Sequence, residues 1–220
     1  MSSNNSERIY AELRERICLL EYPPGTPLRE EALAQEFGVS RTPIRRVLHR
    51  LEFEGLVNIS RGSGTIVTTV DLKQLKDIYA LRLKLTELVG ELSSSRISEE
   101  KVQELEALLE TSKQMHQRRG DVREMGRLYN AFHHIMLHVI GNVALRQIID
   151  RLFHQTARVW LQILPDLDWE EEVEMVVDEI SSVIEALRAG DMQRVAEIRH
   201  KHMAMLLQRI NDYLGSAIVG

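Results

Sequence analysis

The sequence lacks the features of a secreted or membrane-bound protein. Its single cysteine, Cys18, excludes a disulfide within the chain and favours a reducing compartment. No apolar run approaches the roughly 18 residues of a membrane-spanning helix, and the first ten residues lack a basic segment followed by an apolar core. These absences predict a cytoplasmic protein with no membrane partner.

Motifs for catalysis are also missing. There is no HExxH zinc motif, no phosphate-binding glycine loop, no nucleophile motif and no pair of carboxylates close to the histidines. An enzyme is therefore disfavoured. What remains is a chain of 220 residues, 44% hydrophobic and 28% charged, which suits one or two globular domains.

The stretch from Glu30 to Val67 has the pattern of two short helices, a turn and a two-stranded wing. Apolar residues at helical spacing predict a first helix that ends near Phe37, with Gly38 as its stop. Ser40 is the predicted N-cap of a second helix over 41–53. Two helices joined by a short turn that contains glycine are typical of a helix-turn-helix.

The second of these helices has an apolar face and a cationic face. From position 40 to 62 there are five arginines against two acids, in a chain whose pI is about 5.9, so the positive charge is local. Arg41 and Thr42 lie in the first turn, which in a recognition helix reaches base edges, and Arg45 and Arg46 extend the cationic face. A charged face alone is often only solvated, so the combination with the turn and wing carries the DNA-binding prediction.

The predicted wing is a hairpin with strands over 57–60 and 65–68. The glycines at 62 and 64 form its turn, and Arg61 stands at the tip. Arg61 and the backbone N–H groups around Gly62 could follow phosphates or enter the minor groove.

Residues 22–67, with the segments PPGTPL and LAQEFGVSRTPIRRVLHRLEFEGLV and the glycine wing, resemble the winged-helix domain of GntR-family bacterial transcription regulators. Two positions depart from the family pattern: Glu31 replaces a DNA-contacting arginine, and Arg46 stands where an acid is common. A different operator sequence is expected. The resemblance implies base and phosphate contacts by Ser40, Arg41, Thr42 and Arg45, with Arg61 and Gly62 from the wing.

Beyond the wing, helical periodicity predicts a C-terminal domain made of helices only. With short connections these helices should form an antiparallel bundle. The predicted architecture is therefore mostly α, with a winged-helix domain over 1–70 and an all-helical domain over 71–220. The helices are expected over 71–93, 98–118, 122–140, 142–163, 168–189 and 191–214.

The C-terminal part resembles the FCD effector domain of the FadR-type subfamily, through IYALRLKLTE, AFHHIMLHVIGN and IEALRAGDMQRVAEIRHKH. Six helices place it nearer the VanR-like branch. Members often hold a divalent metal with one Asp and three His. Here His133 and His202 match two ligand positions, whereas Tyr129 and Ile180 occupy the other two. A tightly bound metal is therefore disfavoured, because transition-metal sites need three or four ligands. A metal site rearranged around another histidine stays open as the alternative.

Arg82, Tyr129, His133 and His202 are predicted to line a metal-free effector pocket. A partly buried arginine needs an anion, which is either an internal acid or the carboxylate of a small organic effector. As the alternative, His133 and His202 are hydrogen-bonded core residues and the helical domain only dimerises. The functional prediction is a homodimeric repressor that binds a palindromic double-stranded operator and responds to such an effector.

Overall fold

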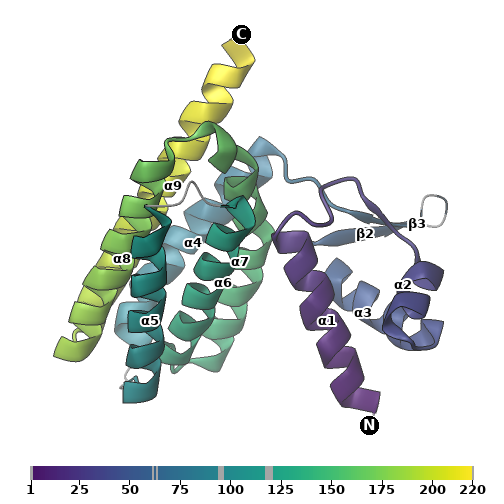
Figure 1. Cartoon of the computed structure of the whole chain (residues 1–220), viewed down its shortest axis with the longest axis horizontal. Helices are drawn as coiled ribbons and strands as arrows, with labels where there is room; N and C mark the ends of the chain where they lie inside the picture. The colour runs from purple at the N-terminus through teal and green to yellow at the C-terminus, as the bar shows by residue number, and fades with distance from the viewer. Residues whose placement is uncertain (1, 61, 63, 94–96, 117–120, 220) are drawn as a thin grey trace.

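The protein is described by a computed structural model that covers residues 2–60, 62, 64–93, 97–116 and 121–219. A winged-helix unit and a helical bundle lie side by side (Figure 1). The predicted architecture, a winged helix followed by a bundle of helices only, is confirmed. No helix among the described residues is long and apolar enough to cross a membrane.

The winged-helix unit packs three helices and a small antiparallel sheet around one hydrophobic core. Gly38 ends α2 in the left-handed conformation, with a φ of 64°, as its position predicts. The sheet order is β1-β3-β2, with Leu28 opposite Thr65 and Val57 opposite Val67. The elements are α1 (Ser2–Cys18), β1 (Pro27–Leu28), α2 (Glu30–Phe37), α3 (Arg41–Phe53), β2 (Val57–Ser60) and β3 (Gly64–Val67).

Three local predictions for this unit need correction. Strand β1 was not predicted, because the proline-rich stretch before it indicated only a turn, yet Pro27 and Leu28 pair with β3. The second wing strand begins one residue earlier than predicted, at Gly64. Ser40 does occupy the N-cap of α3 with extended backbone, but its hydroxyl makes no capping hydrogen bond.

The bundle follows the predicted helices to within a few residues. Side chains of Asp71, Ser98, Asp121, Asn142 and Asp168 accept backbone N–H bonds at the helix starts, which satisfies donors that a helix leaves free. The last helix runs further than predicted, to Val219. The elements are α4 (Leu72–Leu92), α5 (Glu99–Met115), α6 (Val122–Val139), α7 (Val143–Ile163), the short 3-10 helix η1 (Leu164–Asp166), α8 (Trp169–Ala189) and α9 (Met192–Val219).

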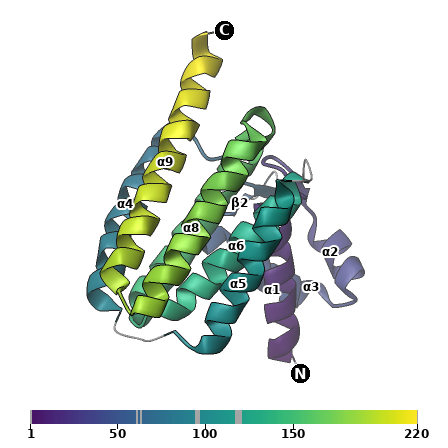
Figure 2. The same ribbon diagram turned by 60° about the vertical axis from the view of Figure 1, so that its left-hand side comes forward.

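Helix α7 packs against both units. It packs against α4, α6 and α9 within the bundle and against α1 of the winged-helix unit. In both views α1 runs between the bundle and the pair α2 and α3 (Figures 1 and 2). Leu19, just after α1, belongs to the core of the bundle and not to that of the winged helix. The DNA-binding unit is therefore seated on α7, which in turn packs against the helices that carry the predicted effector residues.

Candidate DNA-binding surface and effector cavity

The recognition helix α3 presents a buried and an exposed face. Ile44, Val47, Leu48 and Leu51 are buried in the winged-helix core. The predicted DNA contacts on this unit are all exposed where they are described: Ser40, Arg41, Thr42, Arg45, Arg46 and Gly62. Arg61 lies outside the described residues.

Two acids at the start of α2 hold the arginines of α3. Arg41 Nη2 lies 2.5 Å from Glu31 Oε1, and Arg45 donates from Nε and Nη2 to the two oxygens of Glu30 at 3.0 and 2.8 Å. The hydrogen bond from Arg45 lowers the pKa of Glu30 below its ordinary value. Glu31, which replaces a DNA-contacting arginine of the family, therefore serves as a partner for Arg41 in the free protein.

A cavity opens inside the bundle between α4, α6, α7 and α9. Its free volume is about 40 Å³, and since a water molecule needs roughly 10–15 Å³ of such space, it has room for roughly three waters. A ligand larger than this would have to widen the cavity. Most of the wall is apolar, and the polar side chains in it are Arg82, Thr86, His133 and Arg199. The apolar lining residues are Val89, Met136, Leu137, Ile140, Ile149, Val195, Ala196 and Met203.

Arg82 is a buried charge without a carboxylate partner among the described residues. Its guanidinium donates from Nη1 to Thr156 Oγ1 at 2.5 Å and lies 5.0 Å from the ring centre of Tyr79. Burial lowers the pKa of Arg82 below its ordinary value. Because arginine stays protonated in proteins, the result is a cation whose charge no described acid neutralises.

Arg199, the second guanidinium in the cavity wall, already has a partner. Its Nη1 lies 2.5 Å from Glu179 Oε1 in a pair that is almost fully buried. Burial lowers the pKa of Arg199, but the charge of Glu179 and the interactions with Tyr129 together outweigh that effect, and the net shift is upward. Arg199 was not among the predicted pocket residues, although it stands in the segment EIRHKH three residues before His202. The cavity wall thus carries two guanidinium groups, and one of them is paired with a carboxylate that lines the neighbouring, smaller cavity.

The four predicted pocket residues do not meet in one cavity. Arg82 and His133 line the cavity just described, whereas Tyr129 and His202 line a second, smaller one beside Glu179. His202 Nε2 lies 3.2 Å from Asp178 on α8. The helical periodicity gave the right faces but could not show that aromatic packing around Tyr129 separates the two spaces.

The metal positions of the FCD family do not form a ligand set here. His133 and His202 open onto different cavities. Burial raises the pKa of Tyr129 to about 12, so its phenol stays neutral and is a poor ligand, and Ile180 has no donor atom. The one group of possible ligands found in the described residues is His133, Asp150 and His154, with donor atoms within 4.8 Å of one another.

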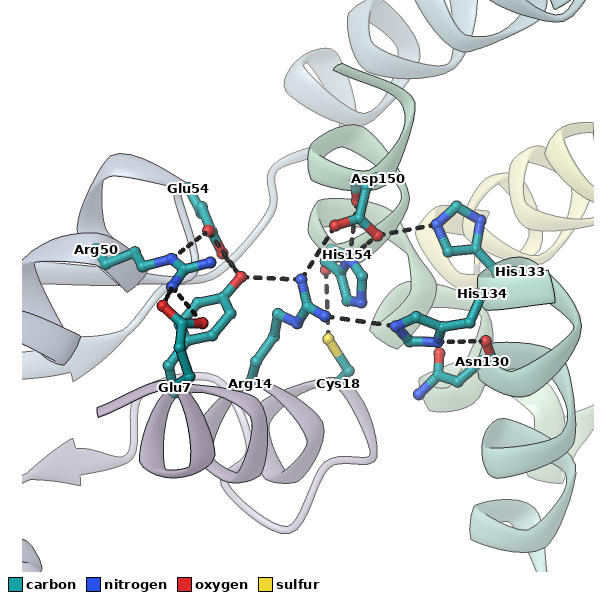
Figure 3. A network of polar contacts seen from close by, with 11 residues as sticks. Glu7, Arg14, Cys18, Arg50, Glu54, Asn130, His133, His134, Asp150 and His154 are labelled. Carbon is teal, nitrogen blue, oxygen red and sulfur yellow. Dashed lines mark hydrogen bonds and ion pairs between the residues drawn. The ribbon is translucent and has the colours of Figure 1, made fainter. Parts of the chain in front are cut away.

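That group is already engaged with a cation from the other domain (Figure 3). Arg14 on α1 donates to Asp150 Oδ2 at 3.1 Å, while His133 Nε2 lies 3.1 Å from Asp150 Oδ1. His154 Nδ1 forms a hydrogen bond of 2.7 Å with the backbone oxygen of Asp150. A metal would have to compete with the Arg14 guanidinium for the same carboxylate. The residues therefore fit an ion-pair network across the domain boundary better than a metal centre.

A cationic recognition helix in a winged helix, joined to a separate helical domain, defines a DNA-binding protein of the helix-turn-helix class. Comparison with known sequences narrows this class. Residues 5–67 match the family described as bacterial regulatory proteins, gntR family, and residues 77–205 match the FCD domain. The chain therefore belongs to the GntR family of transcription regulators and carries an FCD domain.

Curated relatives agree with this assignment. The HTH-type transcriptional regulator YdhC of Bacillus subtilis is 32% identical over 146 residues, which are 66% of this chain and 65% of YdhC. McbR of Escherichia coli is 24% identical over 210 residues, 91% of each chain. The gluconate operon repressor of Bacillus subtilis is 26% identical over 212 residues, 93% of this chain and 84% of the repressor. The family and these relatives are transcription regulators and not enzymes.

Solved structures show the same fold. That of E. coli McbR/YncC has a TM-score of 0.82 at 20% identity and covers 96% of this chain and 98% of its own. A putative GntR regulator from Rhodococcus sp. RHA1 has a TM-score of 0.73 at 16% identity and covers 95% and 98%. The arrangement of a winged helix on a helical bundle is thus shared with other proteins of the family.

Proposed function

We propose that this protein is a homodimeric repressor whose affinity for a palindromic operator is set by a small organic acid bound in the helical domain. It would act in the cytoplasm, where bacterial DNA is found. The observation that carries the proposal is Arg82, a buried guanidinium at the wall of a cavity, with a hydroxyl but no described carboxylate as partner. A buried cation of this kind is costly unless an anion joins it.

The charge and lining of the cavity favour a monoanion with a compact apolar body. Arg199 is neutralised by Glu179, so Arg82 is left as one excess positive charge. A single carboxylate would balance it and could form the paired hydrogen bonds that guanidinium and carboxylate make. Since the rest of the wall is largely apolar, a second charged group on the ligand would lie against aliphatic side chains and lose its hydration.

We also propose that this sensing needs no tightly bound metal. Arg82 supplies the positive charge that a metal supplies elsewhere in the family. Elemental mass spectrometry on untagged protein purified without chelator tests this, with His133→Ala as the comparison. About one metal per chain, lost in the variant, would overturn the metal-free proposal, whereas no metal in either protein would support it.

Dimerisation through the bundle is the remaining part of the proposal. Leu81, Leu88 and Leu92 on α4 are 47%, 37% and 45% exposed, a set of large apolar side chains on one helix. A second copy of the chain would cover them and place two recognition helices on the two halves of a palindrome. Light scattering should give a dimer for the wild type and a folded monomer for Leu88→Glu. A Leu88→Glu variant that remained a dimer would place the interface elsewhere.

The effector proposal is tested by fluorescence anisotropy with DNA from the region upstream of the gene. Small monocarboxylates such as formate, acetate and propionate are compared with their amides and with dicarboxylates. The wild type should lose operator affinity with at least one monocarboxylate and with none of the amides. Arg82→Met should bind the operator and ignore every acid. If no acid changes the wild type, or Arg82→Met responds equally, the helical domain only dimerises or senses by another group.

A further inference from the structure

A series of polar contacts runs without a break from the effector cavity to the recognition helix (Figure 3). It starts at His133, whose imidazole lines the cavity and lies 3.1 Å from Asp150 Oδ1. Asp150 accepts from Arg14 Nη1 at 3.1 Å, and the same nitrogen lies 2.9 Å from Tyr10 Oη. Tyr10 donates to Glu54, the residue that caps the C-terminus of α3, at 2.8 Å. We call His133, Asp150, Arg14, Tyr10 and Glu54 the interdomain chain.

We infer that the interdomain chain transmits the state of the cavity to the recognition helix, with Asp150 and Arg14 as its positioning residues. This inference rests on the proposed function, because it explains how an occupied cavity would reach the DNA. Coupling between sites requires a physical element that both sites can bias. Here that element is the packing of α1 against α7, which the ion pair between Arg14 and Asp150 stabilises.

The two ends of the chain have the necessary properties. His133 is 2% exposed and stacks face to face on Phe153 at 3.7 Å, so a ligand that moves it must also move its bond to Asp150. At the other end, Arg50 of α3 lies 3.4 Å from the ring centre of Tyr10 and 3.6 Å from Glu54. A shift of Tyr10 therefore acts on the last turns of the recognition helix.

Other contacts across the boundary do not share this property. Gln155 donates to the backbone oxygen of Glu54 at 2.6 Å, and Arg158 donates to Thr68 at 2.7 Å. Neither Gln155 nor Arg158 lines the cavity. In the part of the chain that the structure describes, these contacts hold the domains together, whereas the interdomain chain also touches the ligand space.

The pair of Arg14 and Asp150 is well placed to be responsive. The side chain of Arg14 is 15% exposed and that of Asp150 is 25% exposed, so both are largely shielded from solvent but neither is fully buried. Burial raises the pKa of Asp150, but the hydrogen bond from His133 and the charges of His154 and Arg14 outweigh it and keep the pKa below its ordinary value. Asp150 thus remains an anion that His133 and Arg14 share.

A double-mutant cycle on operator affinity tests the inference without any effector. His133→Phe keeps an aromatic ring against Phe153 but removes the hydrogen bond to Asp150. Asp150→Asn keeps the shape of that side chain and removes its charge. Each single change should weaken operator binding about fivefold or more, in the usual range of coupling between sites. The double variant should bind no more weakly than Asp150→Asn alone, because both changes cut one chain.

A matched pair in the same bundle provides the control. His202 lines the second cavity and lies 3.2 Å from Asp178, and neither residue takes part in the interdomain chain. His202→Phe, Asp178→Asn and their double variant should leave operator affinity unchanged. Tyr10→Phe cuts the chain on the DNA side without touching the bundle, and it should abolish the effect of His133→Phe as Asp150→Asn does.

The outcomes separate this inference from the proposed function. If the effects of His133→Phe and Asp150→Asn on operator affinity are additive, in proteins with unchanged circular dichroism, the interdomain chain does not transmit the state of the cavity. This conclusion holds whether or not an acid changes operator affinity. Equal weakening by the His202 and Asp178 variants would also overturn the inference, because the loss would then be general destabilisation. If the double-mutant cycle gives the expected non-additive result but no acid changes operator affinity, the interdomain chain is supported and the proposed effector is refuted.

Discussion

Two histidines buried in the helical bundle should make the protein lose stability on mild acidification. His154 is 3% exposed, and burial lowers its pKa from 6.5 to about 4. The pKa of His133 is lowered well below its ordinary value, also by burial. Between these values and pH 6.5 the unfolded chain binds protons that the folded chain does not. The free energy of unfolding therefore has its full value above pH 6.5, and it decreases as the pH is lowered toward 4.

The size of the loss follows from the pKa of His154. One pKa unit corresponds to about 1.36 kcal/mol, and between pH 7 and pH 5 the difference in proton binding at this residue amounts to about 2 kcal/mol. His133 adds to it. Carboxylates contribute little in this window because they titrate lower, and the pKa of Asp150 lies below even the ordinary value. Against a typical total of roughly 5–15 kcal/mol, a loss of this size is easily measured.

Urea unfolding followed by tryptophan fluorescence measures this change in the right domain, because Trp160 and Trp169 both lie in the bundle. The wild type should lose about 2 kcal/mol or more between pH 7 and pH 5. His154→Gln cannot titrate and should lose about 2 kcal/mol less over the same interval. A wild type equally stable at both pH values, or a variant that loses as much as the wild type, would refute the neutral, buried state of His154.

Four further predictions concern single side chains. Arg45→Ala should cost about 1–3 kcal/mol of operator binding and relax specificity at one base pair, whereas equal weakening on all DNA would make Arg45 a phosphate contact. Glu31→Gln should tighten binding to operator and random DNA alike in titrations at several salt concentrations, because the acid repels phosphates and reads no base. Arg158→Met should raise the melting temperature, since Arg158 is 1% exposed, its Nε and Nη1 have no partner among the described residues, and the cost of burying this charge should exceed the gain from its one hydrogen bond to Thr68. Gly38→Ala should cost about 1 kcal/mol in urea unfolding through its φ of 64°, and Gly38→Asn less.

The fold could be read from the sequence because its local signals agree with one another. Gly38 ends α2 in the left-handed conformation at the predicted place. Asp121 caps the start of α6, and Asp168 and Gly190 cap the two ends of α8, within one residue of the predicted helix bounds. Strand β1 escaped because two residues carry no periodicity, and its partner in the sheet is nearly forty positions away along the chain. Strand pairing of this kind depends on tertiary contacts that sequence spacing does not encode.

The candidate sites were only partly accessible from the sequence. The exposed arginines of α3 follow from helical spacing, but their pairing with Glu30 and Glu31 depends on how α2 crosses α3. In the bundle, Arg82 stood out as a charge on an apolar face. The role of Asp150 could not be predicted, because its partner Arg14 lies 136 positions away in another domain. A charged residue on a helix gives no sign of such a partner.

For a sensor of the proposed kind, the use of a guanidinium in place of a metal would have a physical consequence. Arg82 has no described counter-charge, so the ligand-free protein carries the desolvation cost of a buried cation. An entering carboxylate removes that cost as well as making new bonds, and both terms add to its affinity. Strong selection for a single negative charge therefore follows from Arg82 itself, and a neutral isostere of the ligand gains neither term.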